Sequence, residues 1–67
     1  MDANRLKGKM IEQRLNVAQT AELLGMNKST LYRKLHGFEK LTISDASQLK
    51  NVLNLTESEA ITIFLES

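Results

Sequence analysis

Residues 17–36 read VAQTAELLGMNKSTLYRKLH, and they are the most informative part of the 67-residue chain. Its spacing fits two short helices joined by a tight turn at Gly25, because glycine adopts a positive φ at little cost. Ala21 is small enough for the second helix to cross close to its backbone. Four larger apolar residues are expected to lie under the turn or to anchor the pair to the core: Leu24, Met26, Leu31 and Leu35.

Length and composition limit what the rest of the chain can be. With 67 residues, 42% of them hydrophobic, the chain is expected to form one small folded domain over 1–67. The chain has neither proline nor cysteine. The absence of cysteine excludes disulfides and thiolate metal sites, so stability must come from packed helices or from oligomerisation. No apolar run approaches the ~20 residues of a membrane span, and the N-terminus lacks the apolar core of a signal peptide. We therefore expect a reducing intracellular compartment.

Charge is divided unequally along the chain, although the formal net charge is only +1. Residues 1–40 carry eight basic and four acidic side chains, whereas residues 41–67 carry one basic side chain, Lys50, and four acidic ones. Such a split favours an anionic partner for the first part of the chain. Surface charge scattered by chance stays the alternative, because no basic run is dense.

Cap residues and glycines place the helices. Four residues are predicted N-caps: Asn16, Asn27, Thr42 and Thr56. Asn16 with Gln19, and Thr56 with Glu59, have the spacing of a capping box, and Gly37 stands where a helix should end. Helices are predicted at about 3–14, 17–24, 28–36, 43–53 and 57–65. No segment keeps a period-2 alternation, so the expected fold class is all-α.

The predicted core follows from apolar residues at three- and four-residue steps. These are Leu6, Met10 and Ile11 in the first helix, Ile43, Ala46, Leu49, Val52 and Leu53 in the fourth, and Ala60, Ile61, Phe64 and Leu65 in the fifth. Ile63 falls outside the arc of the fifth helix. It is expected to be either a stray exposed side chain or a dimer contact.

Gly8 lies inside the first predicted helix, between Lys7 and Lys9. A glycine in a helix interior costs about 1 kcal/mol relative to alanine, so its presence needs a reason. We expect the close approach of another helix to supply that reason. The alternative is a phosphate that passes near the bare backbone.

The opening stretch also resembles the helix-turn-helix of the Cro/repressor (XRE-type) family of phage and bacterial transcription regulators. The matching residues are Thr20-Ala21, Leu24-Gly25-Met26, Ser29, Leu31 and His36. Further along, STLYRKLHG and LTISDASQLKNVLNLTESEAITIFL are similar to small, single-domain, phage-associated members, so the resemblance covers nearly the whole chain. It implies a five-helix, lambda-repressor-like DNA-binding domain in which the helix at 28–36 enters the major groove.

Two positions depart from that family's pattern. The family usually has glutamine at the first motif position, where it helps to hold a phosphate, but this chain has Val17 there, and Gln19 faces elsewhere. Many members also have glutamine where this chain has Lys28. Because lysine more naturally approaches guanine O6/N7 or a phosphate, we expect recognition that does not depend on paired glutamines.

The resemblance assigns site residues position by position. The positions that match the family's groove-facing ones are Lys28, Ser29, Tyr32 and Arg33. Arg33 is the leading candidate for a bidentate guanine contact, worth ~1–3 kcal/mol of discrimination. Asn27 and Thr30, in the first turn, could donate to a backbone phosphate. Lys34, His36 and Lys40 are expected either to contact the phosphate backbone or simply to be solvated at the surface. Simpler roles stay open, among them N-capping for Asn27, cover of the following loop for Tyr32 and helix-dipole stabilisation for His36.

The expected function is that of a sequence-specific double-stranded DNA-binding transcriptional regulator of repressor type. Its setting would be the cytoplasm and nucleoid of a bacterial or phage-infected cell. One short helix reads few base pairs, so we expect a homodimer on a palindromic operator with half-sites ~34–36 Å apart. With no separate dimerisation domain, that dimer would use the helices at 43–53 and 57–65, and it would be weak or form only on DNA.

Other classes of function are less well supported. The single histidine, His36, has no thiol near it, and the carboxylates are scattered, so neither an enzyme, nor a metal site, nor a cofactor is expected. The main alternative is a protein-interaction module of the same fold, antirepressor or antitoxin-like. Its docking surface would include Ile63 and Phe64. Occlusion of the face that bears Lys28, Tyr32 and Arg33 would favour it.

Overall fold

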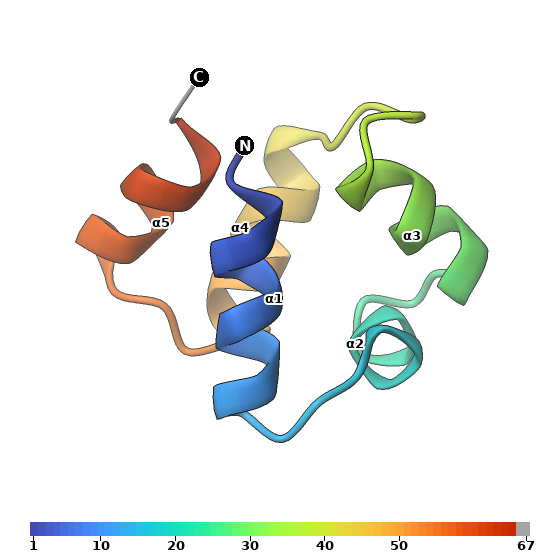
Figure 1. Ribbon diagram of the computed structural model, residues 1–67, viewed down its shortest axis with the longest axis horizontal. Helices are drawn as coiled ribbons and strands as arrows, with labels where there is room; N and C mark the ends of the chain where they lie inside the picture. The colour runs from blue at the N-terminus through green and yellow to red at the C-terminus, as the bar shows by residue number, and fades with distance from the viewer. Residues whose placement is uncertain (66–67) are drawn as a thin grey trace.

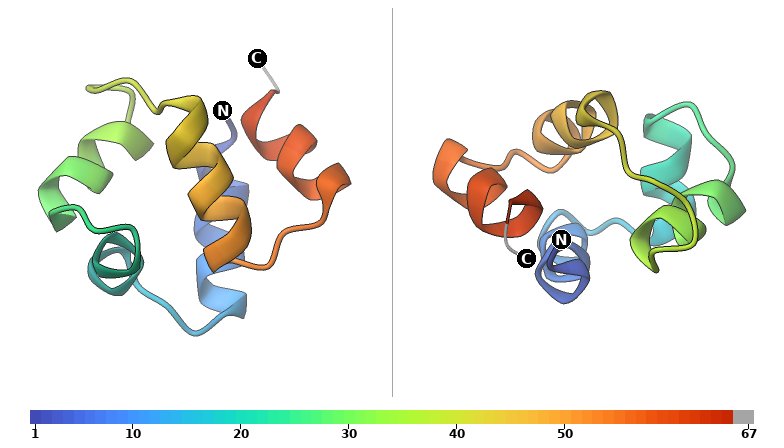
Figure 2. Two further views of the ribbon diagram at one scale, coloured as in Figure 1. Left: turned by 180° about the vertical axis from the view of Figure 1, so that it is seen from behind. Right: turned by 90° about the horizontal axis from the view of Figure 1, so that it is seen from above.

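Five helices and no strand make up residues 1–65, the part of the chain that this computed structural model describes. The helices are α1 (Ala3–Glu12), α2 (Val17–Leu23), α3 (Lys28–Leu35), α4 (Ile43–Val52) and α5 (Glu57–Phe64). In the middle, α1 and α4 lie one behind the other, with α5 on one side and the α2–α3 pair on the other (Figures 1 and 2). The predicted all-α fold is confirmed, and each helix ends one or two residues earlier than expected. Within the described range, no helix is both long and apolar enough to span a bilayer.

Capping boxes close three of the helix starts. At α2, the Asn16 side-chain oxygen accepts the Gln19 N–H at 2.8 Å, and the Gln19 side chain accepts the Asn16 N–H at 2.9 Å. The same reciprocal pattern closes α4 and α5, in the pairs Thr42–Asp45 and Thr56–Glu59. Because these bonds satisfy N–H groups that a helix leaves unpaired, they fix where each helix begins.

The starts of α1 and α3 differ from the prediction. Asp2, which the sequence did not single out, caps α1 by accepting the Arg5 N–H at 3.1 Å. Asn27 occupies the N-cap position of α3, but its side chain makes no capping hydrogen bond. The expected capping role of the Asn27 side chain is therefore not realised, and its carboxamide lies exposed at the start of α3.

The first four helices end in the same way, with a left-handed residue and a hydrogen bond that spans the last turn. The left-handed residues are Arg14, Gly25, Gly37 and Asn54. In each turn the next N–H donates to a carbonyl five positions back, at 2.8–3.0 Å: Leu15 to Met10, Met26 to Ala21, Phe38 to Arg33 and Leu55 to Lys50. Three of these four donors pack on the core, whereas Phe38 is 77% exposed.

The core draws apolar side chains from all five helices, as expected, but three details of the prediction outside α5 are wrong. Ile11 and Ile43, which were expected inside, are 74% and 90% exposed. Ile11 follows the buried Met10 and points about 100° away from it, and Ile43 is the first residue of α4, beyond the end of the core. Gly8 is not needed for packing either, because a Cβ there would meet no atom within 4 Å.

The buried face of α5 is not the predicted one. Ile63 is 1% exposed, whereas Ile61 and Leu65 are 54% and 77% exposed. Two arcs of this helix share Ala60 and Phe64, and the contacts of α5 with α1 and α4 bury the arc that includes Ile63. Ile63 is therefore a core residue, and it is neither a stray surface side chain nor an exposed dimer contact.

Candidate nucleic-acid interface

Small and fully packed side chains hold α2 against α3. Ala21 is 1% exposed, as its predicted role at the helix crossing requires, and Leu31 from α3 is completely buried. Thr20 is also completely buried, and its hydroxyl donates to the Asn16 carbonyl at 2.8 Å, so no polar atom is left unpaired there. Gly25 makes the turn with a φ of +71°. This frame fixes the orientation of α3 on the molecule.

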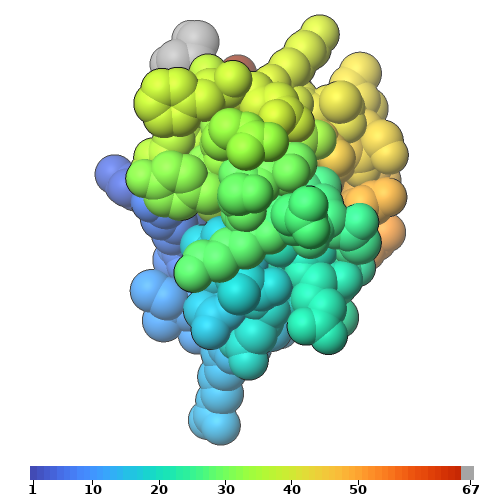
Figure 3. Space-filling view, turned by 90° about the vertical axis from the view of Figure 1, so that its right-hand side faces the viewer, coloured from blue at the N-terminus to red at the C-terminus, as the bar shows by residue number. Residues whose placement is uncertain are grey.

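The opposite side of α3 lies in solvent and carries most of the residues that were predicted to contact DNA. Five of them are exposed, and we call them the α3 face: Asn27, Lys28, Ser29, Tyr32 and Arg33. Lys40, in the loop after α3, is exposed as well, whereas Thr30 and Lys34 are half-buried. Figure 3 views this side of the molecule, with α3 in the middle, α2 below it and α1 at one edge.

The basic side chains fall into two groups. Five of them form ion pairs: Arg5, Lys9, Arg33, Lys34 and Lys50. The other four have no carboxylate partner within residues 1–65: Lys7, Arg14, Lys28 and Lys40. All four belong to residues 1–40, where the sequence has its excess of positive charge. The charge that is available to an anion is therefore concentrated in the first part of the chain.

Lys34 is not part of this available charge. Its ammonium lies 2.5 Å from an Asp45 carboxylate oxygen, and each of the two side chains is only 12% exposed. Burial raises the pKa of Asp45, but hydrogen bonds from Lys34 and Thr42 outweigh that effect and leave the pKa below its ordinary value. This bond ties α3 to the start of α4, and the phosphate contact of Lys34 stays a prediction.

Arg33 is held by a carboxylate that the sequence analysis missed. Its Nε and Nη2 atoms donate to one oxygen of Glu39 at 3.3 and 3.2 Å, and both side chains stay about half exposed. The turn at Gly37 sets this register, because the N–H groups of Phe38 and Glu39 both donate to the Arg33 carbonyl. The only signal in the sequence was a carboxylate placed two residues after the glycine that ends the helix.

A row of side chains continues the α3 face onto α1. The rings of Tyr32 and His36 lie 4.1 Å apart between centroids, and the Lys7 ammonium lies 3.5 Å from His36 Nε2. Tyr32 thus packs on His36, next to the loop that it was expected to cover. Among residues 1–65, no group of three or more His, Cys, Asp or Glu side chains is placed to hold a metal ion. The region offers hydrogen-bond donors and positive charge.

The crossing of α2 and α3, the glycine turn between them and the solvent-exposed second helix define a helix-turn-helix domain. A protein-family model described as "Bacterial regulatory protein, Fis family" matches residues 9–38, which include the end of α1, all of α2 and α3, and the turn after α3. This match supports a helix-turn-helix DNA-binding domain, and it does not single out the Cro/repressor family. Searches of curated proteins and of solved structures gave no match.

Proposed function

We propose that this protein is a sequence-specific double-stranded DNA-binding regulator of transcription that inserts α3 into the major groove. The observation that carries the proposal is the composition of the α3 face, which is exposed, rich in donors and free of large aliphatic side chains. An α-helix fits the major groove, and such side chains suit the base edges and phosphates found there. The Fis-family match over residues 9–38 supports the same class of function.

Each side chain of the α3 face has a role in this proposal. Arg33 contacts guanine, using the guanidinium N–H groups that Glu39 does not occupy. Lys28 contacts guanine or a phosphate at the N-terminal end of α3. Ser29 and Tyr32 lie between them, and the Tyr32 ring reaches a thymine methyl. The Asn27 side chain makes no capping hydrogen bond, and its amide N–H groups donate to a phosphate.

Backbone contacts flank this face in the same proposal. The Thr30 side chain, in the first turn of α3, is half-buried, and its hydroxyl donates to a backbone phosphate. Lys40 has no carboxylate partner in the described part of the chain and binds the backbone beyond the other end of α3. The phosphate contact of Lys34 stays a prediction, because Lys34 is bound to Asp45.

The regulator in this proposal is a phage-type repressor that acts as a homodimer on a palindromic operator. The resemblance to the Cro/repressor family supports this finer assignment, and so does the small number of base pairs that an eight-residue helix can reach. The dimer contact lies in the α4–α5 region and excludes Ile63, which is core. A protein-interaction module would be favoured by an occluded α3 face, and Tyr32 is 51% exposed, so we prefer DNA as the partner.

The experiment that tests this function is a selection of bound duplexes from a random pool by the full chain. We expect a short motif that contains guanine and recurs as an inverted repeat, with half-sites one helical turn apart. A motif without symmetry would contradict the homodimer and leave DNA recognition standing. A pool that shows no enrichment, together with capture of a protein instead of DNA, would contradict the proposed function itself.

A further inference from the structure

We infer that Lys7, Gly8 and His36 form a binding site for one phosphate of the DNA backbone, where α1 meets the end of α3. This inference rests on the proposed function and extends it to a helix outside the helix-turn-helix. Two basic groups from distant parts of the chain meet here, since Lys7 Nζ lies 3.5 Å from His36 Nε2. Neither group has a carboxylate partner within the described residues. The Lys7 ammonium is therefore available to an anion at this point.

His36 positions the lysine. An ammonium has three donors and no acceptor, so in this contact Lys7 donates to His36 Nε2 and keeps two N–H groups for another partner. The His36 ring is itself held by the Tyr32 ring, at 4.1 Å between centroids. This contact favours one position of the Lys7 ammonium, next to the His36 ring. A fixed ammonium loses less entropy than a free one when it binds a phosphate.

Gly8 leaves the backbone of α1 bare one residue after Lys7. It lies inside α1, where glycine costs about 1 kcal/mol relative to alanine, and no neighbouring atom requires it, because a Cβ would meet nothing within 4 Å. Packing therefore does not explain the residue. A phosphate that passes over the bare backbone next to Lys7 does explain it, because any side chain at position 8 would fill that approach.

The site also lies where a phosphate is expected. The row from Tyr32 through His36 to Lys7 starts on the α3 face and ends on α1, and α1 borders α3 on this side of the molecule (Figure 3). The eight residues of α3 span ~12 Å, close to the ~12 Å width of the major groove. When the first turn of α3 contacts bases, its C-terminal end lies near the edge of the groove, where the backbone runs.

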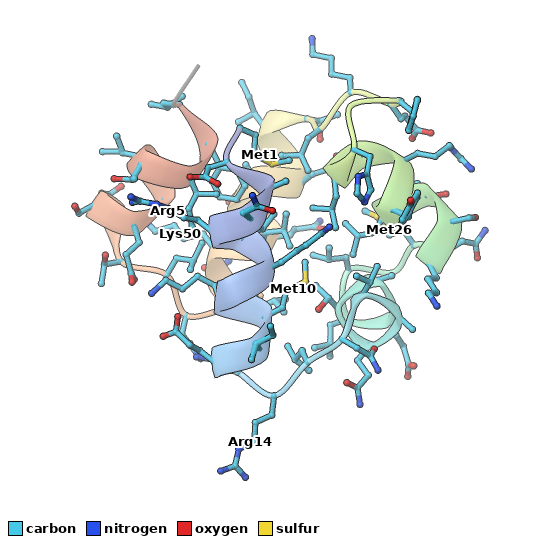
Figure 4. The ribbon with its side chains drawn as sticks, in the orientation of Figure 1. Met1, Arg5, Met10, Arg14, Met26 and Lys50 are labelled. Carbon is cyan, nitrogen blue, oxygen red and sulfur yellow. The ribbon has the colours of Figure 1, made fainter. Side chains whose placement is uncertain are left out.

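The test compares Lys7→Gln with Arg14→Gln, using the full chain and its selected duplex. Arg14 is a matched control, because it also lacks a carboxylate partner in the described chain and its side chain points away from α3 at the far end of α1 (Figure 4). We expect Lys7→Gln to reduce the slope of log affinity against log salt by about 0.9, a loss of roughly eightfold at 0.1 M salt. The loss should be equal on a random duplex, and Lys7→Arg should restore the slope. An unchanged slope in Lys7→Gln would overturn the assignment.

A second variant separates this site from a purely structural role. Gly8→Ala should raise the thermal midpoint, because alanine favours the helix, and should at the same time weaken binding to the selected duplex. A stabilised Gly8→Ala protein with undiminished affinity would overturn the phosphate site and leave the proposed function intact. If the wild-type protein bound no duplex in a salt-dependent way, the proposed function itself would fail.

Discussion

The α3 face and the contacts between helices use charged side chains in opposite ways. Between helices, Lys34 is paired with Asp45 and Lys9 with Glu59, and both carboxylates also close a capping box. On the α3 face, Lys28 has no carboxylate partner in the described chain, and Arg33 is held only by an exposed one. The difference indicates which cations serve the fold and which are available to a ligand. Substitutions in each of the two regions test this difference.

The largest expected effect is on stability. Asp45→Ala should lower the free energy of unfolding by about 3 kcal/mol. It leaves the largely buried Lys34 ammonium without its carboxylate partner, and it removes the capping box of α4. Chemical denaturation of the purified protein measures this loss. Glu57→Ala is the control, since it breaks an ion pair with Lys50 in which the Glu57 side chain is 84% exposed. It should lower the free energy of unfolding by less than about 1 kcal/mol. Similar losses in both variants would contradict the structural role given to Lys34–Asp45.

The next effect is on DNA discrimination. Arg33→Ala should weaken binding to the selected duplex by about 5- to 150-fold, the equivalent of ~1–3 kcal/mol, and should affect a random duplex much less. Competition binding with the two duplexes measures the difference. Arg5→Ala removes an exposed arginine of α1 and should change both affinities little. Equal losses on both duplexes would contradict base contact by Arg33.

A smaller effect is expected at the carboxylate that holds Arg33. Glu39→Gln removes a negative charge next to the α3 face and weakens the contact that holds the Arg33 guanidinium. Affinity for a random duplex should therefore rise by up to about fivefold, which corresponds to the free energy of an exposed ion pair. Glu22→Gln removes an exposed charge from α2 that pairs with no cation among residues 1–65. If both substitutions raise the affinity equally, the effect is one of net charge alone.

The smallest effect concerns the pH dependence of the α1–α5 contact. The Lys9 ammonium and the Thr56 backbone N–H lower the pKa of Glu59 from 4.5 to about 2. Because the pKa of Glu59 is lower in the folded protein, ionised Glu59 stabilises the fold fully above pH 4.5. This contribution to the free energy of unfolding is lost as the pH falls toward 2. The thermal midpoint should therefore fall less steeply between these pH values in Glu59→Gln than in the wild-type protein. If the thermal midpoints of Glu59→Gln and the wild-type protein fell in parallel with pH, the role of Glu59 would be contradicted. The control is Glu12→Gln, which changes the exposed second carboxylate partner of Lys9.

The helices could be predicted because their ends depend on local chemistry. Capping residues act within three positions, and Gly25 and Gly37 end their helices with a left-handed backbone that glycine adopts easily. The buried Ala21 and Leu31 follow from the same local spacing. Helix boundaries and the helix-turn-helix frame were therefore accessible from residues 17–36 and their neighbours.

Several contacts that the sequence did not predict depend on how the helices and turns pack together. Lys34 meets Asp45 only because α3 and α4 pack together, and Ile63 is buried because α5 turns that side to α1 and α4. A helical wheel ranks the faces of one helix, but it does not contain the neighbours that choose between two similar arcs. The Arg33–Glu39 pair needed the geometry of the turn at Gly37.

An unpaired cation on the α3 face is expected to bind DNA, whereas a paired cation elsewhere is not. The most direct measurement compares Lys28→Gln with Lys50→Gln by fluorescence anisotropy on the selected duplex at 0.1 M salt. Each substitution removes one positive charge, but only Lys50 is paired within the described chain, with Glu57. We predict a loss of roughly eightfold for Lys28→Gln, the value of one neutralised phosphate, and a change of less than about twofold for Lys50→Gln. Equal losses would contradict the claim, because binding would then depend on net charge and not on α3.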